Sequence, residues 1–129
     1  MPATVFKLFG RWADKENGQV YGEMFKGCTN LKSPPFRLPC VNLIGYCYYS
    51  MFYGCTSLIR TPELPASILA PSCYSNMFNG CSNLTTISKF NAKTIANYSC
   101  QYMFNNCKSL KYVNNIHFDK IIYNGGYYV

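Results

Sequence analysis

The chain has 129 residues, of which 49% are hydrophobic. That is enough for one domain with a buried core and too apolar for a disordered chain. The formal net charge is +7, with five acidic residues and one histidine. So few titratable groups do not favour an enzyme, because acid–base catalysis needs two such groups brought together. The closest candidate pair, His117 and Asp119, is better explained as an exposed polar pair.

Residues 1–23 are predicted to form an N-terminal cap, a short strand or hairpin followed by a turn. Their apolar run is very short, and Lys7 interrupts it before Arg11 follows. This does not have the form of a signal peptide, and no segment of the sequence reaches the length of a membrane span. We therefore expect the cytoplasm or an assembly such as a virion, without membrane insertion.

A five-residue motif, Met-Phe-x-Gly/Asn-Cys, then recurs at steps of 27, 26 and 26 residues. A fixed period of this length is typical of a solenoid, in which each repeat is one coil stacked on the next. The motif predicts four coils, at 24–50, 51–76, 77–102 and 103–122. The copies begin at Met24, Met51, Met77 and Met103.

Apolar residues follow each repeated cysteine at steps of three for about ten residues, which matches neither a strand alternation nor a long helix. In the second coil they are Leu58, Thr61 and Leu64, with Leu69 after a further five residues. This spacing predicts a short strand and bends that direct these side chains into a narrow interior.

The second half of each coil begins with Cys-Tyr and leads back to Met-Phe, as in Cys47 to Phe52. This spacing predicts a short helical turn with one buried face, held by packing because it is too short to be stable alone. Gly27, Gly54, Gly80 and Asn106 would end these turns with a left-handed backbone. Residues 123–129, which contain the turn-forming pair Asn124-Gly125, are predicted to be a C-terminal cap or a docking strand.

These motifs resemble the BspA-type leucine-rich repeats, over residues 24–122 and in segments such as Met51 to Leu58 and Pro62 to Ala66. The Met-Phe variant is similar to repeats of gut Bacteroidetes surface proteins and, by extension, of their phages. The resemblance implies a right-handed solenoid with short parallel strands and short helical turns. It also implies adhesion, or protein or glycan binding, and no catalytic residues.

The cysteines fall into two sets of equivalent positions, which favours buried thiols over disulfides. Parallel Cβ vectors on stacked coils do not give the torsion that a disulfide requires, and a free thiol packs as a small hydrophobe. Without a CxxC pair, the sequence indicates neither zinc nor any cofactor. The two sets are Cys28, Cys55, Cys81 and Cys107, and Cys47, Cys73 and Cys100; Cys40 stands apart from both.

From Met24 onward the chain contains nine lysines and arginines and two acidic residues. Its tyrosines are concentrated on the side that is predicted to form the helical turns. Such a surface can bind acidic glycans or proteins, whereas scattered lysines do not favour nucleic acid. We expect a non-enzymatic module that recognises a surface protein or glycan through its strand side. The alternative is a structural decoration or linker protein that joins copies or virion partners through its caps. The candidate ligand-binding residues are Lys32, Arg60, Thr86, Lys111 and Tyr112.

Overall fold

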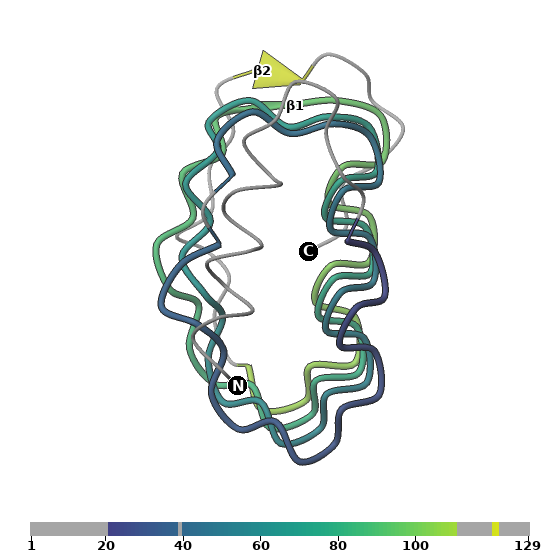
Figure 1. The fold of residues 1–129 in the computed structure, drawn as a ribbon, viewed down its shortest axis with the longest axis vertical. Coiled ribbons are helices and arrows are strands. Elements are labelled where there is room, and N and C mark those ends of the chain that lie inside the picture. The colour runs from purple at the N-terminus through teal and green to yellow at the C-terminus, as the bar shows by residue number, and fades with distance from the viewer. Residues whose placement is uncertain (1–20, 39, 111–119, 122–129) are drawn as a thin grey trace.

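A computed structural model describes residues 21–38, 40–110 and 120–121. Viewed along the stack, successive turns of the chain superpose on one another (Figure 1). Backbone hydrogen bonds join residues 25–27 positions apart, as in Leu38 N–H to the Glu63 carbonyl at 3.0 Å. The 26-residue sequence period is therefore the period of a stacked repeat.

Among the described residues, regular strand lies at one corner of the repeat. Strand β1, Thr94–Ile95, pairs in parallel with β2, Lys120–Ile121 (Figure 1). Isolated parallel bridges continue the pairing at a step of 26 residues, and they include Arg37 to Glu63 and Arg60 to Thr86. Of the parallel strands that the resemblance implies, the described residues contain one two-residue pair and isolated bridges.

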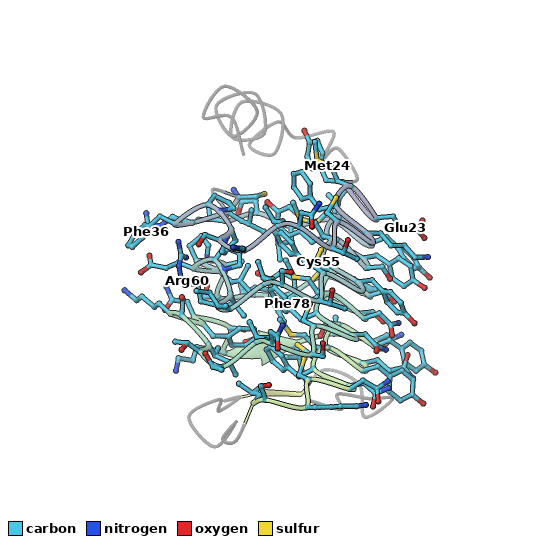
Figure 2. All side chains as sticks on the ribbon, turned by 90° about the horizontal axis from the view of Figure 1, so that it is seen from below. Glu23, Met24, Phe36, Cys55, Arg60 and Phe78 are labelled. Atoms are coloured by element: carbon cyan, nitrogen blue, oxygen red, sulfur yellow. The ribbon has the colours of Figure 1, made fainter. Side chains whose placement is uncertain are left out.

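The inward positions predicted from the apolar spacing form the core. Leu58, Thr61, Leu64 and Leu69 are all buried. The repeated phenylalanines stack face to face, with 5.4 Å between the ring centroids of Phe52 and Phe78 and an interplanar angle of 3°. Identical side chains thus fill the same place in successive units, and Figure 2 shows Phe78 and Cys55 between the two faces of the stack.

The predicted helical turns are wrong: the structure assigns no helix to any residue that it describes. Four segments, which we call the turn segments, are instead runs of overlapping β-turns along the right side of Figure 1. In the second of these, the N–H groups of Cys47 and Met51 bond to carbonyls three residues earlier, those of Ile44 and Tyr48. The turn segments are residues 21–28, 46–55, 72–81 and 98–107.

Helix is prevented because the remaining N–H groups bond to the following unit instead. Tyr48, Ser50 and Phe52 donate to the carbonyls of Cys73, Ser75 and Met77 at 2.9–3.0 Å. An α-helix would direct these groups to the carbonyl four residues earlier. The backbone also turns left-handed at every fourth residue, with φ of 62° at Tyr46 and 52° at Ser50, which no α-helix tolerates.

The predicted left-handed positions are confirmed. Gly54 and Gly80 have φ of 73° and 80°, and Asn106 has 62°. Glycine has no Cβ to clash in this region, and asparagine is the side chain that tolerates it best. Each therefore sits where the last β-turn of its segment requires it.

Seven of the eight cysteines are buried, and none of the eight forms a disulfide, as predicted. The Sγ atoms of Cys55, Cys81 and Cys107 each donate to a phenylalanine carbonyl of the preceding unit, at 3.0–3.1 Å. Burial was wrongly predicted for Cys28, which is exposed.

The core side chain of Tyr74 carries a polar atom without a partner among the described residues. The Tyr74 ring is buried between its neighbours, and its hydroxyl has no hydrogen-bond partner. An unsatisfied buried hydroxyl costs about 1–3 kcal/mol. We therefore expect Tyr74→Phe to raise the free energy of unfolding by about 1 kcal/mol in urea titration. The exposed Tyr53→Phe is the matched control and should change nothing; a loss of stability in Tyr74→Phe would show that its hydroxyl is satisfied.

Candidate ligand-binding surface

The strand side carries an outward row that inter-unit hydrogen bonds hold in register. Ile59 N–H bonds to the Lys32 carbonyl at 3.1 Å, and Thr85 N–H bonds to the Ile59 carbonyl at 3.0 Å. Arg60 and Thr86 pair as a parallel bridge beside this row. We call this set, Lys32, Ile59, Arg60, Thr85 and Thr86, the basic ladder.

The structure brings three of the predicted site residues together. Lys32 and Thr86 are exposed and Arg60 is half-buried, and Figure 2 shows Arg60 on the side of the stack opposite Glu23. The Arg60 Nη2 atom donates to the Pro34 carbonyl at 3.2 Å, so part of its hydrogen-bonding capacity is used within the fold. The other two predicted residues, Lys111 and Tyr112, lie outside the described residues.

An ion pair flanks the ladder. Arg37 Nη2 lies 3.2 Å from Glu63 Oε1, joining one unit to the next. The arginine side chain is 55% exposed, and a solvated pair of this kind adds little stability. The pair does neutralise the charge of Arg37. The cations that the basic ladder offers to a ligand are therefore Lys32 and Arg60.

The tyrosines of the turn side divide into two groups, and the prediction that all of them crowd the surface is wrong. Tyr48 and Tyr74 are 1% exposed and stack in the core, with 6.2 Å between ring centroids. Tyr46, in contrast, is 56% exposed and was missed by the sequence analysis. Its spacing of two repeat lengths from Tyr98 would have placed it on the same outward column.

Two observations on the described residues concern metal binding and the reactivity of the cysteines. No cluster of three or more His, Cys, Asp or Glu side chains among them could hold a metal ion. Burial raises the pKa of the Cys55 thiol to about 11 and that of Cys47 to about 12. A thiol becomes a nucleophile only as the thiolate, so these two cysteines stay unreactive at neutral pH.

The comparisons with known proteins give one match. A family described as the BspA type leucine rich repeat region, in six copies, matches residues 14–127. No curated protein and no solved structure matches the chain. Within the part of the chain that the structure describes, no helix is long and apolar enough to cross a membrane.

Proposed function

The chain belongs to the BspA-type leucine-rich repeat family, and from this premise we propose that it is a non-enzymatic binding module. It would recognise a protein or glycan at a cell surface, as part of a virion or a bacterial surface assembly. The observation that carries the proposal is the basic ladder, which presents Lys32, Arg60 and Thr86 on one rigid face. A repeat array offers such rows for binding because each unit repeats the same outward positions.

The proposal includes a finer architecture. We propose a right-handed solenoid of four coils over residues 24–122, with caps at 1–23 and 123–129. The stacked phenylalanines and the hydrogen bonds between units support successive coils within the described range. Lys111 and Tyr112, one repeat length beyond Thr85 and Thr86, would extend the basic ladder by one coil.

Arg60→Ala tests the ladder. Removing the guanidinium loses one partly buried hydrogen bond to the Pro34 carbonyl, so we expect the free energy of unfolding to fall by about 1 kcal/mol. We expect binding of labelled protein to intact Bacteroidetes cells to weaken severalfold, because a cation of the ladder is gone. Ser82→Ala, a change at a half-buried, uncharged residue, is the control variant and should bind like the wild type. Unchanged binding by a folded Arg60→Ala protein would contradict the assignment of this face.

A second candidate function is structural, as a decoration or linker protein without an outside ligand. Met24 is 43% exposed, whereas the equivalent Met51 and Met77 are fully buried. Figure 2 shows Met24 at one end of the described stack. An apolar end of this kind favours docking onto another subunit. A folded wild-type protein that binds no cells would move the function to this candidate, with its partner inside its own particle.

A further inference from the structure

The first turn segment ends the described stack with a row of unpaired backbone carbonyls. Those of Gly22, Met24 and Lys26 accept no hydrogen bond from any described residue. In the second turn segment, the carbonyl of Met51 accepts the N–H group of Phe25 at 2.9 Å, and the other two carbonyls of its row also accept a bond from the first segment. A row of unpaired backbone groups is a template on which another chain can continue the pairing. We call the carbonyls of Gly22, Met24 and Lys26 the acceptor edge.

Side chains at the acceptor edge are exposed where their equivalents in the next unit are buried. Met24 is 43% exposed and lies at the end of the stack in Figure 2, whereas Met51 is fully buried. The thiol of Cys28 is exposed, whereas the equivalent Cys55 donates its thiol to the carbonyl of Phe25 at 3.0 Å. The edge therefore lacks the contacts that one further layer of the same kind would supply.

Hydrogen-bond polarity decides what can complete this edge. Backbone carbonyls only accept, so the acceptor edges of two copies cannot pair with each other. Within the molecule, such a row is filled by N–H groups from alternate residues of a turn segment. Phe52 and Gly54, for example, donate to the carbonyls of Met77 and Asn79 at 2.9 and 2.8 Å. The acceptor edge therefore fits a polypeptide in the same turn conformation.

The opposite end of a second copy fits the edge poorly. The ring of Phe104, in the fourth turn segment, is only 6% exposed, so little of it is left for another ring to cover. Phe25 is half-buried, and among the described residues its one ring neighbour is Phe52 at 5.6 Å. A different chain can therefore extend the column of stacked rings beyond Phe25, whereas a second copy has no open ring to bring to it.

We propose that the acceptor edge docks a turn segment of a different repeat protein. The partner presents N–H groups at alternate residues to the three carbonyls, stacks an aromatic ring on Phe25 and offers a carbonyl to the thiol of Cys28. Each of these contacts already joins the units of this chain, so the partner continues an existing interface. The inference rests on the structural candidate function and names its partner, and it does not depend on the ligand of the basic ladder.

A synthetic peptide with the sequence of residues 72–84, with alanine at both cysteine positions, is the probe, because it contains a whole turn segment. A control peptide carries N-methyl groups on the backbone nitrogens of Phe78 and Gly80, which removes two donors and keeps every side chain. In the protein, Met24→Glu places a charge where the docked segment would lie. Ile68→Glu, at a side chain that is 64% exposed, is the matched control variant.

We expect the labelled peptide to bind the wild type and Ile68→Glu with saturation, measured by fluorescence anisotropy. The N-methylated peptide, and the peptide with Met24→Glu, should each bind at least about tenfold more weakly. Bound peptide should also slow the alkylation of the exposed Cys28.

No saturable binding, equal binding of the N-methylated peptide, or equal binding by Met24→Glu would each overturn the proposal. Self-association of the wild type that Met24→Glu abolishes would overturn the choice of partner and assign the edge to a second copy. The binding of Met24→Glu to intact cells tests the basic ladder separately, and it should equal that of the wild type.

Discussion

Replacing Phe78 by alanine is expected to destabilise the protein by roughly 3–5 kcal/mol, the usual loss for a large core side chain. Phe78 is fully buried, and its ring stacks on Phe52 at 5.4 Å and on Phe104 at 5.6 Å. Alanine removes the contacts with both rings and leaves a cavity in the column of stacked phenylalanines. Domains of this size have a free energy of unfolding of about 5–15 kcal/mol, so the variant would lose a large part of its stability. Thermal and urea unfolding measure the change.

Phe25→Ala is the matched control, because it removes the same side chain from the first unit described. Phe25 is only half-buried, and the described residues give it one ring neighbour, Phe52 at 5.6 Å. We expect a clearly smaller loss than for Phe78→Ala. Equal losses would contradict the idea that the interior rings carry the stack.

Raising the pH from 8 to 10 is expected to remove most of the stability of the reduced protein. Burial raises the pKa of Cys55 to about 11 and that of Cys100 and Cys107 to about 12, and it raises the pKa of Cys47, Cys73 and Cys81 as well. An unfolded thiol titrates near 8.5. Above that pH, the unfolded chain releases protons that the folded chain keeps.

The sign follows from proton linkage. The folded state binds more protons in this range, so stability is fully present below pH 8.5 and falls as the pH rises towards the folded-state pKa values. Each thiol contributes about 1.4 kcal/mol per pH unit, so the six together approach about 8 kcal/mol per unit. Urea unfolding at pH 8, 9 and 10, with a reductant present, would measure this slope.

Two single variants calibrate the slope. Cys81→Ala removes one buried thiol and should flatten it by about 1.4 kcal/mol per pH unit, although the protein starts less stable. Cys28→Ala removes the exposed thiol and should leave the slope unchanged. A free energy of unfolding that stays flat from pH 8 to 10 would show that the thiols are not buried as the structure has them.

The sequence predicted the period, the core positions and the state of the cysteines, because each depends on one side chain per repeat. Leu58, Phe78 and Cys81 mark positions that recur 26 or 27 residues apart, and stacking then buries them without further information. The same repeat spacing also predicts part of the candidate site, because it places Lys32, Arg60 and Thr86 on one face.

The turn segments could not be predicted in the same way. The spacing of Cys47, Phe52 and Cys55 suits one face of a helix as well as one face of a β-turn run, so periodicity alone does not separate them. The choice is made by hydrogen bonds to the next unit, which are tertiary contacts. A weak local signal did exist, since Asn76 and Gly80 stand four residues apart at left-handed positions. Tyr46, Tyr98 and Tyr102 hide that signal, because tyrosine is not expected there.

The backbone hydrogen bonds that join the turn segments of successive units all run one way, and this bears on how such a gene can change. The backbone N–H groups of Glu23, Ser50 and Asn76 each donate to the following unit, which supplies the carbonyl acceptor. The trailing edge of every unit therefore fits the leading edge of any other. In-frame duplication or loss of a whole repeat leaves every junction equivalent, so the length of the array can drift by recombination. A small insertion within a turn segment breaks the register, and selection would confine insertions to the strand-side bends.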